Sequence, residues 1–121
     1  MPMTQADLPD IRRLASNGAL SFTAHAAQQI VSRGIPYDDV EKILTSQTNQ
    51  IIECQSPSCA PGKAHTNERV LVYDPQSQVD AIVIFCPLLL PTPEIRIVTV
   101  EMVDDAIWTR QNGQIPCLVR R

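Results

Sequence analysis

The chain has 121 residues, of which 44% are hydrophobic and 19% charged, and these values predict one globular domain with its own core. The net charge of −3 argues against an extended basic face for nucleic acid, although a local basic patch is compatible with it. The acidic N-terminus lacks a signal-peptide core, and no apolar run approaches the ~20 residues of a membrane helix, so we expect a cytoplasmic protein without membrane contact.

The first predicted helix follows Asp7, which suits a helix cap, and carries Pro9 in its first turn. Apolar residues then recur at spacings of three and four, which places them on one helix face. These residues are Leu8, Ile11, Leu14 and Ala15. Asn17 and Gly18 form a typical C-terminal stop, so this helix should end there.

Two further helices are predicted between Phe22 and Leu44, with Ser21 or Thr23 as the first cap and a break at Gly34 and Pro36. The residues expected to face the core are Phe22, Ala26, Ala27 and Ile30 in the first helix and Tyr37, Val40, Ile43 and Leu44 in the second. The opposite, polar side of the first helix carries His25, Gln28, Gln29 and Ser32, and Arg33 follows at the last turn.

Beyond Asn49 the hydrophobic period changes from 3.6 to 2, which predicts strands. The expected strands are 50–54, 69–73, 79–86 and 95–102, with a long loop over 56–67 and a proline-rich connector over 87–93. Simple alternation in the last strand predicts two faces. One face would carry Ile95, Ile97, Thr99 and Glu101, and the other Arg96, Val98, Val100 and Met102.

After the strands, Asp104 is expected to cap a short helix through Trp108 to about Gln111. The tail 115–121 should pack as an extra strand or against a partner. Helices followed by hairpin-linked strands predict a single α+β domain over 1–121, with a core of about 7–103. Two or three N-terminal helices would pack on one face of a three- or four-stranded antiparallel sheet.

His25 and Arg33 are the first candidates for catalysis, because an imidazole can move a proton near neutral pH and a guanidinium can stabilise charge on phosphate. Eight helical residues separate them by about 12 Å along the axis, so they would flank a phosphate-sized ligand rather than share one hydrogen bond. A structural interpretation stays open, in which His25 bonds the backbone near its helix terminus and Arg33 neutralises the helix C-terminus.

Other candidates lie in and around the long loop. Lys63, His65 and Arg69 form a small positive cluster that would suit substrate phosphates, and Glu101 is a candidate general base. Three potential metal ligands, Cys54, Cys59 and His65, have the spacing C-x4-C-x5-H. Structural zinc sites prefer four ligands and tighter cysteine pairs, so ordinary loop thiols are the simpler interpretation and no metal or cofactor is expected.

The central stretch resembles a family of small bacterial domains of unknown function with the pattern F-[ST]-x-H-A, then R-G-I, then D-V-E. Here these motifs are residues 22–26, 33–35 and 39–41, and residues 97–100 are similar to the closing strand of that family. The chain departs from the pattern at Pro36, where a capping serine is usual. Members are similar in layout to RelE-type and BrnT-type toxins, which are small ribonucleases neutralised by a cognate antitoxin.

The resemblance implies a RelE-like fold and a metal-independent endoribonuclease, in which His25 and Arg33 act on RNA. The positive charges of Lys63 and Arg69 make these two residues the next candidates for contact with the substrate. A cognate antitoxin protein or a homodimer would then be the expected protein partner. The alternative is a non-catalytic interaction module on the same fold, which would use residues 87–93 and the C-terminal tail to bind a second copy or another protein.

Overall fold

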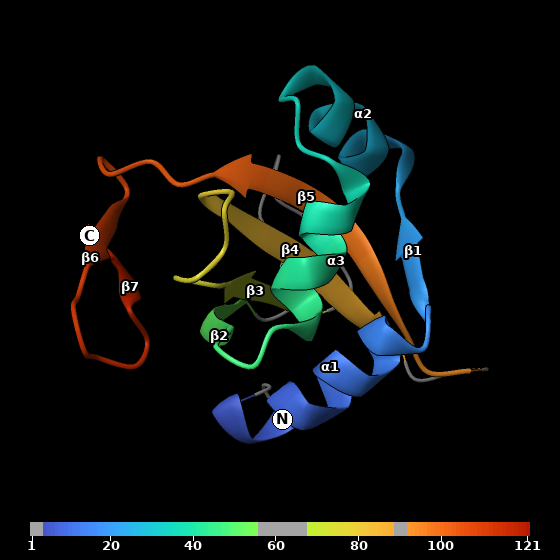
Figure 1. Ribbon diagram of the computed structural model, residues 1–121, viewed down its shortest axis with the longest axis horizontal. Helices are drawn as coiled ribbons and strands as arrows, with labels where there is room; N and C mark the ends of the chain where they lie inside the picture. The colour runs from blue at the N-terminus through green and yellow to red at the C-terminus, as the bar shows by residue number, and fades with distance from the viewer. Residues whose placement is uncertain (1–3, 56–67, 89–91) are drawn as a thin grey trace.

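The computed structural model describes residues 4–55, 68–88 and 92–121, and in this part three helices pack on a five-stranded mixed sheet that is followed by a two-stranded hairpin (Figure 1). The helical elements are η1 (Gln5–Asp7), α1 (Leu8–Ser16), α2 (Ala24–Ser32) and α3 (Tyr37–Thr45). The strands are β1 (Leu20–Phe22), β2 (Gln50–Gln55), β3 (Arg69–Tyr73), β4 (Ala81–Leu88), β5 (Glu94–Met102), β6 (Trp108–Arg110) and β7 (Leu118–Arg120). The predicted α+β class is therefore confirmed.

The sheet differs from the predicted antiparallel one because residues 20–22 form an additional edge strand. The strand order is β1-β5-β4-β3-β2, and β1 pairs with β5 in parallel, with Leu20 opposite Ile95 and Phe22 opposite Ile97. Three residues are too few to show an alternating pattern, so the sequence indicated only a lead-in to the next helix. The other neighbours in the sheet are antiparallel, as expected for hairpin-linked strands.

The N-terminal helix begins one turn earlier than predicted. Thr4 caps η1 by accepting a hydrogen bond from the Ala6 N–H at 3.3 Å, and the Asp7 carboxylate accepts one from the Thr4 N–H at 2.7 Å. Asp7 therefore completes a reciprocal capping box and does not cap α1 with its side chain. The predicted apolar face is confirmed by burial of Leu8, Ile11 and Ala15.

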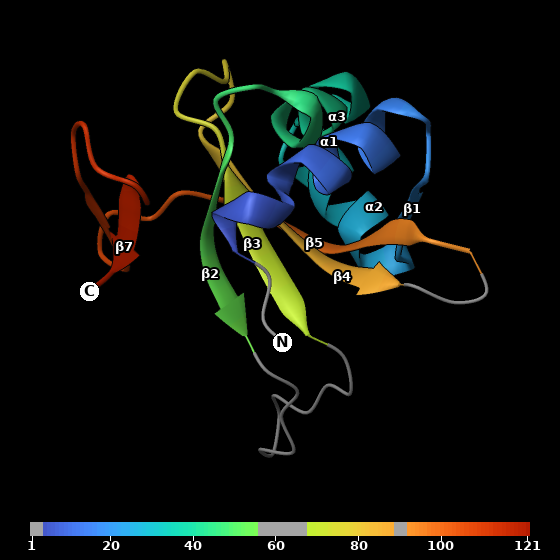
Figure 2. The same ribbon diagram turned by 90° about the horizontal axis from the view of Figure 1, so that it is seen from below.

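The described strands separate two apolar cores. On the helix side, Val40, Ile43 and Phe85 are fully buried with the α1 and α2 residues Ile11 and Ala26. On the other face, Trp108 and Leu118 of the hairpin cover an apolar patch formed by Ile52, Leu71, Tyr73, Ile82 and Ile84. Figure 2 shows the helices together on one side and the hairpin apart from them, beyond β2. Each large side chain buried in this way contributes about 1.5–3 kcal/mol.

The prediction of a helix after Asp104 is wrong. Asp104 does cap, but it caps a turn, in which its carboxylate accepts from the Ala106 N–H at 2.9 Å and its carbonyl accepts from the Trp108 N–H at 3.0 Å. The chain then extends as β6 and pairs with the tail as β7, so the predicted tail strand is confirmed. Burial of Trp108 against the sheet decides this outcome, because an extended strand with a hairpin partner places its ring on that face.

The predicted faces of β5 are wrong from Thr99 onward. Thr99 pairs with Ile84 and Ile97 pairs with Phe85, so Val98 is an extra residue that forms a β-bulge. Two expected core positions are also exposed: Ala27 lies on the surface, and Tyr37 is 46% exposed with its ring centroid 5.1 Å from that of Phe22.

No helix in the described ranges is long and apolar enough to cross a membrane.

Candidate functional site

The polar side of α2 lies against the edge of β5. Pairing with β1 covers β5 only from Ile95 to Ile97, and beyond this point side chains of α2 bond the strand. Gln29 Oε1 accepts a hydrogen bond from the Val100 N–H at 2.9 Å, and the Arg33 guanidinium donates to the Val100 carbonyl. Thr23, at the helix N-cap, donates from its N–H to the Ile97 carbonyl at 3.0 Å. Side chains thus take the place of a neighbouring strand.

Arg33 has a structural partner, the carbonyl of Val100. It follows the last turn of α2, and Gly34 ends the helix with φ of +65°, a conformation that glycine adopts readily and L-residues rarely adopt. A guanidinium carries five N–H donors in a fork, and its bond to one carbonyl leaves donors for a ligand. The residue is exposed, which keeps those donors accessible.

His25 lies one turn before Gln29 on the same side of α2 and is exposed to solvent. The cap of this helix is Thr23, whose hydroxyl oxygen accepts from the Ala26 N–H at 3.1 Å, so His25 does not fill that structural role. On a helical wheel the order around α2 is Arg33, then Gln29, then His25. The imidazole therefore lies next to Gln29 on the wheel, on the side away from Arg33.

Glu101 is the half-buried carboxylate that follows Val100. It pairs with Ile82, whose side chain belongs to the hairpin-side core, so Glu101 lies on the sheet face opposite the helices. Burial raises the pKa of Glu101 above its ordinary value, and the positive charges of Arg120 and Arg33 oppose that shift, whereas the negative charge of Glu53 adds to it. A carboxyl with a raised pKa is suited to exchange protons closer to neutral pH.

A second group of basic residues lies further along the same sheet face. Arg96 pairs with Cys86 across β4 and β5, and Arg69 precedes the pair formed by Val70 and Phe85, so both arginines lie beside Cys86. Burial raises the pKa of the Cys86 thiol, and the two arginines partly offset this. Arg69 Nε is buried without a hydrogen-bond partner among the described residues. Lys63 lies outside the described residues.

The alternative metal site is not assembled in the described part of the chain. Cys54 lies on β2 and packs against the helix-side core, while Cys59 and His65 fall in 56–67, outside the described residues. Within 4–55, 68–88 and 92–121, no group of three or more His, Cys, Asp or Glu side chains is positioned to hold a metal ion.

A hollow of about 470 Å³ lies away from these residues, between η1, the turn before β2 and the turn after β3. Its polar groups already bond one another, because Arg12 Nε donates to Asn49 Oδ1 at 2.9 Å and the Asn49 amide donates to the Ile43 carbonyl at 2.8 Å. Gln5 likewise bonds the backbone of Ile51 through both atoms of its amide. These contacts close the edge of β2 and cap α3, so we assign this hollow a structural role.

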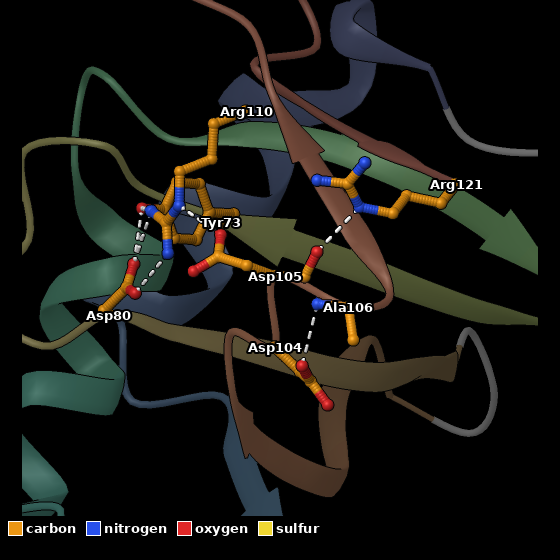
Figure 3. A network of polar contacts seen from close by, with 7 residues as sticks. All are labelled: Tyr73, Asp80, Asp104, Asp105, Ala106, Arg110 and Arg121. Atoms are coloured by element: carbon orange, nitrogen blue, oxygen red, sulfur yellow. Dashed lines mark hydrogen bonds and ion pairs between the residues drawn. The ribbon is translucent and has the colours of Figure 1, made fainter.

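Ion pairs hold the C-terminal hairpin against the sheet (Figure 3). Arg110 bonds both oxygens of Asp80, at 2.6 and 3.2 Å, and also reaches Asp105 at 2.8 Å. Tyr73 donates its hydroxyl hydrogen to Asp80 at 2.7 Å, and burial together with this carboxylate raises the pKa of Tyr73 to about 12. These contacts connect β6 to β3 and to the turn before β4.

On β7, Arg120 makes a bidentate pair with Glu53 at 2.8 and 2.9 Å and lies 4.7 Å from the centroid of the Trp108 ring. Its hydrogen bonds lower the pKa of Glu53. Arg120 thus anchors the hairpin and also brings positive charge near Glu101. Sequence patterns offered no signal for this residue, because its neighbours depend on where the tail folds.

We expect these carboxylates to make the hairpin sensitive to acid. Because the folded pKa of Glu53 is below the unfolded value of about 4.3, its contribution to stability is present above that pH and is lost as the pH falls through the folded pKa. The pair is partly exposed and therefore screened by solvent, so the loss should be roughly 1 kcal/mol or less. Urea unfolding between pH 7 and pH 3, followed by fluorescence of Trp108, measures it. Glu53→Gln should reduce the acid-dependent loss, whereas Glu94→Gln, in a carboxylate paired with Arg96, should leave it unchanged.

Comparisons of the chain with models of protein families, with curated proteins and with solved structures found no match.

Proposed function

We propose that the protein is a small endoribonuclease domain of the RelE-like toxin type that cleaves RNA with its own acid–base groups. The observation that carries the proposal is Glu101, a half-buried carboxyl with a raised pKa that lies within the electrostatic reach of Arg33 and Arg120. His25 adds a second titratable group on the side of α2 nearest to the edge of β5. Cleavage of a phosphodiester by acid–base catalysis needs one group that accepts a proton, one that donates a proton, and positive charge that stabilises the phosphate.

In the proposed reaction, Glu101 accepts the proton of a ribose 2′-hydroxyl, and the 2′-oxygen forms a bond to the adjacent phosphorus. The bond from phosphorus to the 5′-oxygen breaks, and His25 in its protonated form donates a proton to that leaving oxygen. Arg33 stabilises the negative charge of the pentacovalent phosphate with the donors that Val100 does not use. The products are a 2′,3′-cyclic phosphate and a 5′-hydroxyl.

The basic residues beside Cys86 would bind the rest of the substrate. Arg69 and Arg96 share the face of Glu101, and arginine binds phosphate through two parallel hydrogen bonds. Lys63, which lies outside the described residues, remains a further proposed contact. A local patch of this kind is compatible with a net charge of −3, because phosphate binding depends on charges within about a Debye length of 8–10 Å.

A cleavage assay with purified protein tests the proposal. The wild type should cut single-stranded RNA in the presence of a chelator and leave cyclic phosphate ends. His25→Ala should lower kcat/KM about 10²-fold, because removing a general acid costs that much or more. Arg13→Gln, which removes an exposed charge on α1 paired with Asp10, is the control and should retain activity. Wild-type protein that leaves RNA intact, or a fully active His25→Ala variant, would contradict the assignment.

The alternative proposal is protein binding without catalysis, by a cognate antitoxin protein or a second copy of this chain. Of the connector 87–93 to which the sequence assigned this role, residues 89–91 lie outside the described residues. Among the described residues, Val31 on α2 is 81% exposed and is a candidate contact. Light scattering separates the two candidates: an inactive chain whose self-association disappears in Val31→Ser would support the module, and an active monomer would support the nuclease.

A further inference from the structure

The bulge in β5 decides which way Glu101 faces. Ile97 and Val100 both belong to the helix-side core although three positions separate them, which regular alternation does not allow. Val98 absorbs the difference, because it has no partner in β4 and its side chain packs on the hairpin side. Without the extra residue, Glu101 would share the face of Ile95 and Ile97, inside the core beneath the helices.

The backbone around this bulge is bonded by α2. Thr23 Oγ1 lies 3.5 Å from the Val98 carbonyl, and both polar backbone atoms of Val100 bond side chains of α2. Gln29 provides the acceptor for the N–H of Val100, and Arg33 provides the donor for its carbonyl. Beyond Ile97, β1 no longer covers this edge of β5, and here Gln29 and Arg33 satisfy the backbone groups of the residue that precedes Glu101.

We propose that Gln29 is a positioning residue, whose hydrogen bond to Val100 holds the bulged form of β5 and so keeps Glu101 on the sheet face shared with Arg120. The role of Gln29 in catalysis rests on the proposed function, whereas its role in orienting Glu101 does not. The charged groups that act on Glu101 come from three elements: Arg33 beside α2, Arg120 on β7 and Glu53 on β2. A shift of Val100 would change its distance to all of them.

The test replaces Gln29 with methionine, which keeps the length of the side chain and removes the acceptor. We expect kcat to fall about tenfold with little change in KM, because the substrate-binding arginines remain and only the alignment of Glu101 is lost. We also expect the pKa of Glu101, followed by carbon-13 NMR of its carboxyl, to move away from the wild-type value. Gln28→Met, at the exposed neighbouring position, is the matched control and should change neither quantity.

Two further variants test whether the effect comes from loss of the hydrogen-bond acceptor at position 29. Gln29→Glu keeps an acceptor oxygen and should retain kcat within about threefold of wild type, although it adds a charge. Gln29→Asn keeps the amide but is one methylene too short to reach Val100, and it replaces the methionine variant if that variant does not fold. A folded Gln29→Met or Gln29→Asn protein with unchanged kcat and unchanged titration of Glu101 would overturn the inference. If the wild type does not cleave RNA, the proposed function fails, but the titration of Glu101 still decides the role of Gln29.

Discussion

Replacing Glu101 with glutamine should lower kcat/KM for RNA cleavage by about 10²-fold or more, because the amide cannot accept the proton of the 2′-hydroxyl. Glutamine has nearly the same shape as glutamate, so packing against Ile82 and its neighbours should persist. Initial rates of cleavage of a labelled RNA oligonucleotide measure the change. Glu41→Gln on α3 removes the same charge away from the site and should retain wild-type activity.

The pH dependence of kcat/KM provides a second test of Glu101 as the general base. As a general base, Glu101 is active when deprotonated, so kcat/KM should rise with pH through a pKa above the usual value for glutamate. That rising limb should disappear in Glu101→Gln. An unchanged limb, or undiminished activity, would show that another group accepts the proton.

The same substitution should leave stability unchanged or raise it at neutral pH. The folded pKa of Glu101 is above its unfolded value, so the charged form is disfavoured in the fold and stability increases as the pH falls through that pKa. A neutral glutamine removes this unfavourable term. Lower activity without lower stability would separate a catalytic role for Glu101 from a structural one.

Replacing Trp108 with alanine should reduce the free energy of unfolding by about 3–5 kcal/mol, which is the usual cost of truncating a buried aromatic side chain. Trp108 is 1% exposed and belongs to the core between the sheet and the hairpin. Its ring also contacts the guanidinium of Arg120, so the substitution should loosen the ion pair between Arg120 and Glu53. Urea unfolding followed by circular dichroism measures the difference.

Two variants control this result. Ile115→Ala removes an apolar side chain of the same segment that is 70% exposed, and it should change stability by less than about 0.5 kcal/mol. Trp108→Phe should retain part of the packing and fall between wild type and Trp108→Ala. A loss below about 1 kcal/mol for Trp108→Ala would mean that the hairpin contributes little to the fold.

Much of the fold was predictable because it depends on local patterns. Strand β3 was predicted at its observed bounds, and β2, β4 and β5 within two residues at each end, because alternation and turn residues mark them. Helices α2 and α3 were marked by Thr23, Gly34 and Pro36. Strand β1 and the pairing of the tail with residues 108–110 were not predicted, because three-residue strands have no period and form only where a partner segment lies beside them.

The candidate site was predictable in part. His25 and Arg33 stand out as titratable and cationic residues on one polar helix side, and Glu101 stands out as a carboxylate in an apolar strand. Gln29 and Arg120 had no local signal, since the first is identified by its bond to a strand 71 positions away and the second by the fold of the tail. Arg33 has a partner that no helical wheel includes, the carbonyl of Val100.

By itself, the sequence determined the elements with a clear period, the cap of α2 and the apolar stripes, because backbone sterics and local hydrogen bonds decide these within a few residues. Only the tertiary structure decided the parallel edge strand β1, the face on which Glu101 lies and the position of the hairpin. Each of these depends on a contact between distant segments. The bulge at Val98 is the clearest case, because one unpaired residue reverses the face of each residue after it.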